Sequence, residues 1–321
     1  MKTLPFKQYL SLACTMLGAS LTALIVVSFI PNIWLFDIAS QLRLAIAAIV
    51  LMCMPVLLIL RAKAGFALAL LGFTINAVPI LSMYLDRQKT VDARKTVTIL
   101  NFNSEFQHNN QFKLFETLVA EKEPDLVALV EVDKKWLDSI DETMKCYPYK
   151  KVYLVGPGMA YFSKFPIEES NARYYGKSHH PRITATIRVG NRLVRLVLAH
   201  PTTPKSESGY LERNQEISLL KKEMAALNNP KILIGDLNCG PWSPVFADLL
   251  KAGLRDSQQG FGPQPSWPAR SGRVIDGLPI PPLVPIDHVL LSPDIVVMER
   301  TAGPSLGSDH LPVLVKIALP E

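Results

Sequence analysis

The sequence predicts an α+β domain of two packed β-sheets with helices outside, preceded by three transmembrane helices. Three long runs without charged residues occupy the first 95 positions. From residue 96 onward, short β-branched segments alternate with segments of helical periodicity. Hydrophobic residues make up 49% of the 321 residues and charged residues only 19%. This composition excludes a disordered chain and is too apolar for a purely soluble enzyme of this size.

The apolar runs match the length of membrane spans. They cover 22, 17 and 22 residues, at about 9–30, 44–60 and 64–85. A bilayer requires about 20 residues, with a range of about 17–25. The middle run is short, but the flanking Arg43 and Arg61 can extend to the interface. A signal peptide would be followed by a soluble chain, whereas two more runs follow here. We therefore expect a membrane anchor over residues 1–90 and a second domain over 91–321.

Basic residues beside short loops predict the orientation of the anchor. Four of them lie on the side of the amino terminus, namely Lys2, Lys7, Arg61 and Lys63. The loop 31–43 contains only Arg43. The basic cluster in 87–95 argues for the opposite orientation, but residues that lead into a long translocated domain count less in this rule. An odd number of spans then places the second domain outside. We expect an integral protein of a bacterial inner membrane with this domain in the periplasm.

The net charge of +6 comes entirely from the N-terminal part. Nine of the 34 basic residues and three of the 28 acidic residues lie in 1–95, which leaves 25 of each in 96–321. Non-specific binding of nucleic acid depends on a surplus of Lys and Arg. The second domain has no such surplus, although a local basic groove stays open as an alternative. The four cysteines show neither a disulfide framework nor zinc-ligand spacing.

The second domain reads as alternating strands and helices. The strands are expected at 96–103, 125–132, 151–155, 159–163, 182–189, 193–199, 231–235, 286–291, 295–299 and 312–319. Helices are expected at 111–123, at 209–227 and shortly after Pro244. The segment 260–285 is rich in Pro and Gly, and long loops of this kind in compact domains tend to be functional.

Polar side chains lie at the ends of several of these strands. In chain order they are Asn101, Asn103, Glu131, His200, Asp236, Asn238, Asp287, Asp309 and His310. A single acid in such a position is usually a turn or cap residue. So many with complementary chemistry predict one shared cleft.

The chemistry that these residue types suggest is metal-assisted attack of water on a phosphate. Carboxylate and amide oxygens favour Mg²⁺, with Mn²⁺ also possible, over zinc. Glu131 can hold the ion, which polarises a phosphoryl oxygen. Asp236 is the candidate base, and Asn238 in the same turn can orient the nucleophile. An Asp–His pair fixes the tautomer of the imidazole, and Asp287 with His310 is the candidate pair.

The motifs resemble those of the endonuclease/exonuclease/phosphatase superfamily, which includes deoxyribonuclease I, the abasic-site exonucleases, neutral sphingomyelinases and inositol polyphosphate 5-phosphatases. The matching segments are NFN at 101–103, Glu131, AYFSKFPI at 160–167, AHPTTP at 199–204, GDLN at 235–238, IDHVLLS at 286–292 and SDHLPVLV at 308–315. They cover essentially all of 96–321 in the expected order. GDLN together with the terminal SDH is the most specific combination.

The resemblance implies a four-layer α/β/β/α sandwich and a role for each matched residue. Asn101, Glu131 and Asp309 would belong to the metal site. Asp236 would activate water with Asn238 as its partner, and His200 would stabilise the transition state or the leaving group. Asp287 would orient His310, which would contact phosphate. Asn103 stands where abasic nucleases tend to have an acid, which weakens a second metal site and leaves it as a substrate-binding candidate. Arg182 is a further candidate for contact with a substrate phosphate, although a surface turn would also explain its segment.

The expected function is hydrolysis of a phosphodiester or phosphomonoester by direct attack of water. Tethering to a membrane and the zero net charge of the second domain favour a lipid headgroup or another envelope phosphate ester. A nuclease acting on DNA or RNA is the alternative. A catalytically silent membrane scaffold would predict a gap in the site, and none of these strand-end residues is missing. The sequence leaves the oligomeric state open.

Overall fold

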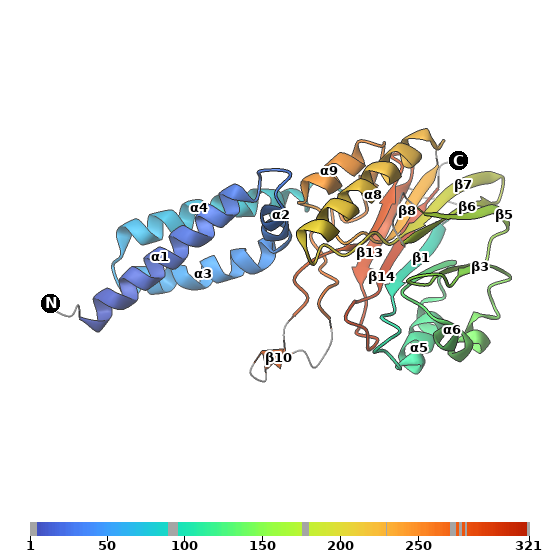
Figure 1. The fold of residues 1–321 in the computed structure, drawn as a ribbon, viewed down its shortest axis with the longest axis horizontal. Coiled ribbons are helices and arrows are strands. Elements are labelled where there is room, and N and C mark those ends of the chain that lie inside the picture. The colour runs from blue at the N-terminus through green and yellow to red at the C-terminus, as the bar shows by residue number, and fades with distance from the viewer. Residues whose placement is uncertain are drawn as a thin grey trace.

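The computed structural model describes residues 5–88, 96–174, 180–228, 230–269, 274–275, 278–279 and 281–319. They form an elongated N-terminal helical unit joined end-on to a larger α/β unit (Figure 1). The domain boundary expected at 90/91 falls within 89–95, outside the described residues.

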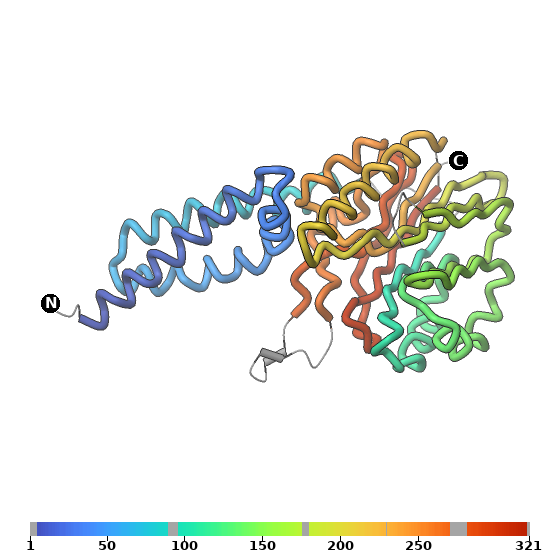
Figure 2. The backbone as a smooth tube through the Cα atoms, viewed as in Figure 1, coloured from blue at the N-terminus to red at the C-terminus, as the bar shows by residue number. Residues whose placement is uncertain are grey.

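The N-terminal unit contains four helices, α1 (Phe6–Val27), α2 (Trp34–Gln41), α3 (Arg43–Ile59) and α4 (Lys63–Ser82). Helices α1 and α4 are each long and apolar enough to cross a membrane. Helices α2 and α3 reach that criterion only as a pair that bends by 68°. The described chain therefore offers two spans, or three if the bent pair counts as one. The segment 31–43, expected to be a loop, contains α2, which lies between the bundle and the α/β unit in both ribbon and tube views (Figures 1 and 2).

Arg43 differs from its expected place at a membrane interface. Its guanidinium is buried between the helices, where it donates to Asn76 Oδ1 (3.1 Å) and to Ser28 Oγ (3.0 Å). It also lies over the ring of Phe29, 4.3 Å from the centroid. A buried charge in an apolar bundle is tolerated only when its donors have acceptors. These contacts provide acceptors from two other segments, so Arg43 ties the helices together.

The α/β unit contains two six-stranded sheets. The first has the order β13 (Val296–Ala302), β14 (Val313–Ala318), β1 (Thr96–Asn103), β2 (Leu126–Val130), β4 (Met159–Ser163) and β3 (Tyr149–Tyr153). The second has the order β5 (Ile167–Tyr174), β6 (Pro181–Val189), β7 (Arg192–Ala199), β8 (Lys231–Asp236), β12 (Asp287–Leu291) and β9 (Arg255–Asp256). A two-stranded ribbon, β10 (Val274–Ile275) with β11 (Leu278–Pro279), lies in the segment expected to be a long loop.

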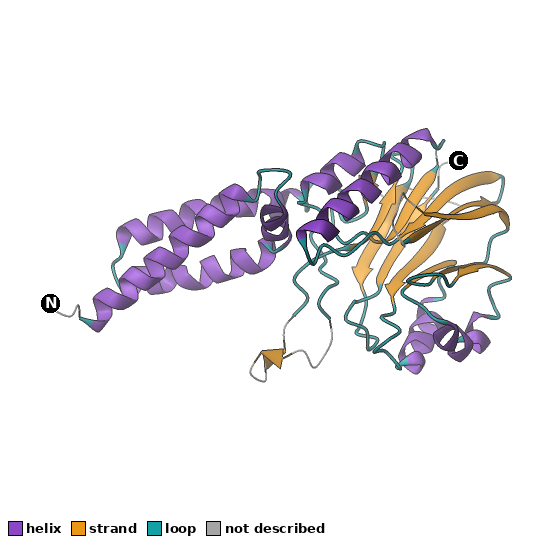
Figure 3. Cartoon of the chain, in the orientation of Figure 1, coloured by secondary structure: helices purple, strands orange, loops and turns teal. Residues whose placement is uncertain are grey.

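The two sheets lie between two layers of helices (Figure 3), and an apolar cluster fills each of the three interfaces between these layers. The central cluster fills the space between the sheets with alternate residues of their strands, such as Ile99, Ile234 and Val315. A second cluster joins the first sheet to α5 (Phe112–Lys122), α6 (Lys134–Ser139) and α7 (Asp141–Met144). A third joins the second sheet to α8 (Glu207–Ala226) and α9 (Pro244–Leu250). The expected α/β/β/α sandwich is confirmed.

The expected strands and helices agree with the structure to within a few residues at their ends. Strand β5 was not expected, because its sequence IEESNARY is polar and exposed on most positions, as suits a strand at the edge of a sheet. Helices α6 and α7 were also missed, since six and four residues are too few for a helical period to be recognised.

The topology brings the strand ends together. Strands β1 and β2 are parallel neighbours in the first sheet, and β7 and β8 are parallel neighbours in the second. Strand β12 runs antiparallel to β8, with Asp287 directly opposite Asp236. Since the sheets pack face to face, the carboxyl ends of β1, β2, β7 and β8 and the amino end of β12 meet at one edge of the sandwich.

Candidate active site

The centre of the strand-end cluster is Asn103, the last residue of β1. Its Nδ2 donates to Glu131 Oε1 (3.0 Å) after β2 and to Asp236 Oδ2 (3.1 Å) at the end of β8. The side chain is buried, and its Oδ1 accepts from the backbone N–H of Glu105. One amide therefore links the two sheets at the point where the acids converge.

Two histidines flank Asp236. The Nε2 of His200 lies 3.1 Å from Glu131 Oε1, and its Nδ1 lies 3.2 Å from the carbonyl oxygen of Asp236. On the other side, the Nδ1 of His310 lies 2.8 Å from Asp287 Oδ2, and its Nε2 lies 3.7 Å from Asp236 Oδ2. The Asp287–His310 pairing expected from the sequence is thus present in the geometry.

The backbone around these acids is unusual. Glu131 and Asn238 both have left-handed φ angles, 52° and 50°, which non-glycine residues rarely adopt. Gly235 has φ 142°, and a Cβ built there would lie 1.9 Å from the carbonyl oxygen of Ala199. Only glycine lets β7 and β8 approach this closely, and the approach places His200 beside Asp236.

Burial and opposite charges shift the pKa values of these groups. Burial raises the pKa of Asp236 to about 6, against the lowering effect of the two histidines. Burial also lowers the pKa of His310, but Asp287 and Asp236 outweigh it and raise that pKa to about 10. The pKa of Glu131 falls to about 2, because its contacts with His200 exceed the effect of burial. At neutral pH the cluster therefore combines ionised acids with imidazolium groups, which suits an anionic substrate.

The residues present fit a divalent metal ion. One possible ligand group is Glu131, His200 and Asp236, and another is Asp236, Asp287 and His310, each with ligand atoms within 4.8 Å of one another. Among the described residues, Asn101 Oδ1 and Asp287 Oδ1 are buried without a hydrogen-bond partner. Buried polar atoms are almost always paired, so these oxygens are available to a ligand. A set rich in hard oxygen donors is typical of Mg²⁺ or Mn²⁺.

The structure places the remaining predicted residues as follows. Asn238 donates its Nδ2 to Pro201 O (2.9 Å), and its backbone N–H donates to Asp236 Oδ1 (2.9 Å). Asp309 borders the cluster and accepts from Trp267 Nε1 (3.1 Å). Asn101 lies deeper between the sheets, with Nδ2 3.5 Å from His288 O.

Arg182 is not brought to the cluster. It lies on β6, is 7% exposed, and its Nε pairs with Glu223 of α8. The geometry therefore gives the predicted substrate contact of Arg182 no support, whereas it places Asn103 nearer the centre than Asn101.

Residues that the sequence did not single out support the GDLN turn at 235–238, which contains Asp236 and Asn238. Arg213 on α8 is fully buried and donates through Nη1 to Asn238 O (2.9 Å). Its Nη2 donates to Asp37 Oδ2 (2.8 Å) on α2, and Asp37 also accepts from Ser243. Asp37 could have been noticed in the sequence, because it is the only charge between Lys7 and Arg43. Nothing in the sequence indicates its partner, which lies 176 residues away.

A cavity of about 540 Å³ opens from the cluster. Its polar end includes Glu131, Asp236, Asn238, Asp309 and His310. Its other walls come from α2, from the loops after β1 and β7 and from the segment before β12. A volume of this size is typical of small-molecule sites.

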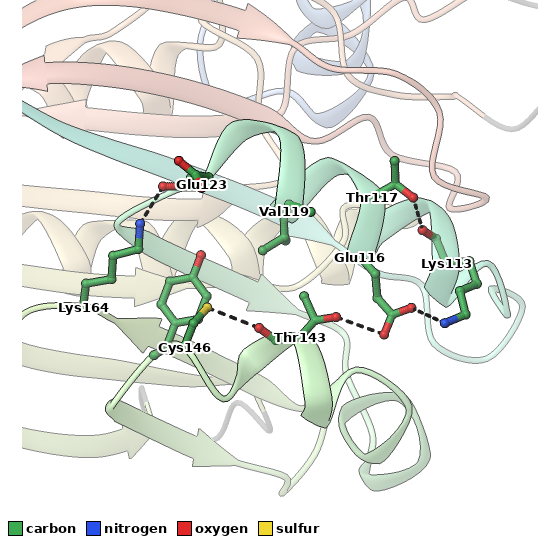
Figure 4. A pocket seen from close by; sticks show the side chains of 10 residues that line it. Lys113, Glu116, Thr117, Val119, Glu123, Thr143, Cys146 and Lys164 are labelled. Carbon is green, nitrogen blue, oxygen red and sulfur yellow. Dashed lines mark hydrogen bonds and ion pairs between the residues drawn. The ribbon is translucent and has the colours of Figure 1, made fainter.

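A second hollow of about 650 Å³ lies beside α5 and α7 (Figure 4). Its polar groups are paired with one another rather than directed at a ligand. Glu116 accepts from Thr143 Oγ1 (3.0 Å) and pairs with Lys113 (3.0 Å). Lys164 Nζ donates to Glu123 O (2.8 Å). These pairings favour the first cavity over this hollow as the candidate active site.

Comparison with solved structures shows the same fold in other proteins. An endonuclease/exonuclease/phosphatase from Beutenbergia cavernae is 17% identical with a TM-score of 0.56, over 71% of this chain and 72% of that chain. TDP2 from D. rerio, solved with a single-strand DNA product, is 16% identical with a TM-score of 0.59, over 70% of this chain and 99% of that chain. A family protein from Leptotrichia buccalis is 17% identical with a TM-score of 0.56, over 69% and 99%. No curated protein sequence matches the chain.

The model of one protein family matches residues 99–310, which span β1 to His310 and include every residue of the cluster. Enzymes of this family are divalent-metal-dependent hydrolases of phosphate esters. The chain belongs to the endonuclease/exonuclease/phosphatase family and is a metal-dependent phosphoesterase.

Proposed function

We propose that the protein is a membrane-anchored, Mg²⁺-dependent phosphoesterase whose substrate is a lipid headgroup or another phosphate ester of the cell envelope. One observation carries this proposal. The cavity that opens from the acid–imidazole cluster has α2 of the apolar N-terminal unit as one of its walls. An enzyme whose site borders its own membrane segment is placed to act on esters at the membrane surface.

In the proposed mechanism Asp236 accepts a proton from the attacking water, and Asn238 holds the Asp236 carboxylate through its backbone N–H. The new bond joins the water oxygen to phosphorus, and the ester P–O bond breaks. His310, oriented by Asp287, donates to a phosphoryl oxygen, and His200 stabilises the charge that develops on the leaving group. Asn103 contacts the substrate or its water.

A divalent cation bound by Glu131, Asn101 and Asp309 would neutralise charge on the phosphoryl group. The pairing of Glu131 with His200 and of Asp309 with Trp267 would keep these carboxylates oriented toward it.

The membrane part of the proposal rests on the surface of the helical unit. Large apolar side chains on all three long helices are exposed, among them Met16, Met52, Ile59 and Val78, which are 61–76% exposed. Such a surface is stable only against lipid or another apolar partner. With the basic residues around Arg61 inside the cell, the catalytic unit would lie in the periplasm of a bacterial inner membrane.

A nuclease is the second candidate, because the fold is shared with TDP2 bound to a single-strand DNA product. The cavity lining argues against it. Among the described residues that line it, Lys205 is the one lysine or arginine, beside four carboxylates. Binding of nucleic acid draws on several Lys and Arg contacts to phosphates. A silent scaffold ranks last, since the residues of the cluster are all in place.

The test uses the full chain in detergent and bis-p-nitrophenyl phosphate with Mg²⁺. Hydrolysis should be abolished by a chelator and should fall about 10²–10⁴-fold in Asp236→Asn. Asp138→Asn, at an exposed site on α6, should retain full activity. An Asp236→Asn protein that remains active would disprove the assignment of the base. Plasmid DNA offered beside labelled phospholipid separates the two candidates, and preferred, salt-sensitive cleavage of DNA would overturn the lipid preference. Alkaline phosphatase and fluorescent protein fusions at the carboxyl terminus test the orientation.

A further inference from the structure

Helix α2 presents one row of apolar side chains to the catalytic cavity. Trp34 and Ile38 of α2 and Leu42, which directly follows the helix, are spaced four residues apart, so they lie along one side. All three line the cavity and are half-buried, and Leu42 also packs against the apolar core of the helical unit. Leu35, on another side of α2, is 63% exposed and does not line the cavity.

The cavity is therefore lined by both polar and apolar side chains. Asp236, Asp309 and His310 belong to the cluster. Val284 and Ile286, of the segment before β12, add to the apolar lining that the row beside α2 provides. A substrate with a phosphate ester at one end and hydrocarbon at the other matches both parts of this lining.

Hydrogen bonds and an ion pair fix the apolar row in position. The indole Nε1 of Trp34 donates to Pro204 O (3.0 Å), in the loop that follows His200. The neighbouring side of α2 is held by the buried ion pair of Asp37 with Arg213 (2.8 Å). Pro204 lies four residues after His200, and Arg213 also donates to Asn238 O, so a rotation of α2 would disturb segments beside the cluster.

The direction of α2 relative to α3 supports a position of the α2 wall at a membrane surface. Its axis is bent by 68° from that of α3. If α3 crosses the bilayer, α2 lies close to the plane of the membrane, where amphipathic helices contact the hydrocarbon boundary. Leu35 and Ile33, 63% and 43% exposed, would face lipid on its outer side.

We propose that Trp34, Ile38 and Leu42 of α2 form a binding subsite for the hydrocarbon part of a membrane phospholipid whose headgroup phosphate is hydrolysed at the cluster. This inference rests on the proposed function and names its substrate class. The subsite selects phosphate esters with an attached alkyl chain over equally reactive esters without one. A nucleic acid strand offers no such chain.

The experiment measures chain-length dependence with soluble chromogenic esters. The full chain, held in an amphipathic polymer free of detergent micelles, is given ethyl, butyl, hexyl and octyl p-nitrophenyl phosphate with Mg²⁺ below their micelle concentrations. The leaving group is p-nitrophenolate in each, so only the apolar part changes. The value of kcat/KM should rise with chain length, by at most about fourfold for each methylene that becomes buried.

Variants on α2 locate the effect. Ile38→Ala and Leu42→Ala should each lower the slope of log kcat/KM against chain length. Leu35→Ala removes an exposed apolar side chain from the same helix and should leave both slope and basal activity unchanged.

The outcomes separate this inference from the proposed function. A flat chain-length series with measurable hydrolysis of the ethyl ester would overturn the subsite and leave the phosphoesterase intact. A slope that Ile38→Ala and Leu42→Ala do not change would also overturn it. Absence of Mg²⁺-dependent hydrolysis of all four esters would instead disprove the proposed function.

Discussion

The ion pair between Asp37 and Arg213 should be a large contributor to stability, because it joins the N-terminal unit to the catalytic unit while fully buried. The side chains of Arg213 and Asp37 are 0% and 4% exposed. Asp37→Ala removes the acceptor of Ser243 Oγ and of Gln41 Nε2 and one of the two acceptors of Arg213 Nη2, which also donates to Asn214 Oδ1. Removing one partner of a buried pair leaves an uncompensated charge, at a cost of about 3–5 kcal/mol.

The expected loss is measurable by thermal unfolding of the full chain in detergent. For a unit of this size, 1 kcal/mol shifts the midpoint by about 2–4 °C, so Asp37→Ala should lower it by roughly 6–20 °C. The activity should fall as well, since Arg213 also supports the carbonyl of Asn238 beside Asp236.

Two further variants test the reasoning. Asp138→Ala breaks an exposed ion pair with Lys134 and should leave the midpoint within about 2 °C. Asp37→Ala combined with Arg213→Met removes both charges. This double variant should regain much of the loss in the unfolding midpoint, because two buried apolar groups leave no unpaired charge. If Asp37→Ala behaves like Asp138→Ala, the buried pair does not hold the two units together.

Three other predictions follow from the cluster. The value of kcat/KM should fall as the pH drops below about 6, because the pKa of Asp236 is raised to about 6 and the base becomes protonated there. A value of kcat/KM that stays constant from pH 7 to pH 5 would exclude Asp236 as the base. Asp287→Asn removes a charge that raises the pKa of His310, so the alkaline limb, near pH 10 in the unmodified protein, should move down by roughly 1–3 units, whereas Asp138→Asn should not move it. Gly235→Ala should cost more than about 2 kcal/mol and abolish activity because its Cβ would collide with Ala199 O. Gly253→Ala is its control, since Gly253 also has positive φ but the nearest atom to a Cβ there is 3.7 Å away, and it should cost about 1 kcal/mol. Equal losses in the two glycine variants would show that backbone conformation, not the close approach of β7, matters at position 235.

Much of the catalytic unit could be predicted because its signals are local. The apolar segment LVALV predicts a buried strand without information from other parts of the chain, and the charged Glu131 after it indicates where the strand ends. The GDLN turn likewise carries its glycine, acid and amide within four residues. The polar edge strand β5 and the short helices α6 and α7 lack such a pattern, so they could not be recognised.

The site was less predictable wherever it depends on contacts between distant segments. The sequence assigned Asn101 to the metal site and Asn103 to substrate binding only because of their positions in the NFN motif. The packing of the two sheets instead places Asn103 within hydrogen-bond distance of both Glu131 and Asp236. Arg182 has the charge of a phosphate ligand, but the proximity of α8 pairs it with Glu223. The contacts of α2 with the α/β unit could not be predicted. Its eight residues lie between two apolar runs and therefore resemble a connecting loop.

The attachment of α2 also changes what a useful fragment of this protein is. A fragment that begins at β1 would omit Asp37 and Trp34, leaving the Arg213 guanidinium without its counter-ion and one flank of the cavity open to solvent. Exchange of the N-terminal helices for an unrelated hydrophobic leader would have the same effect. The helical unit and the α/β unit therefore have to be expressed and purified as one chain. In related sequences, a substitution at position 37 should be accompanied by a compensating substitution at position 213.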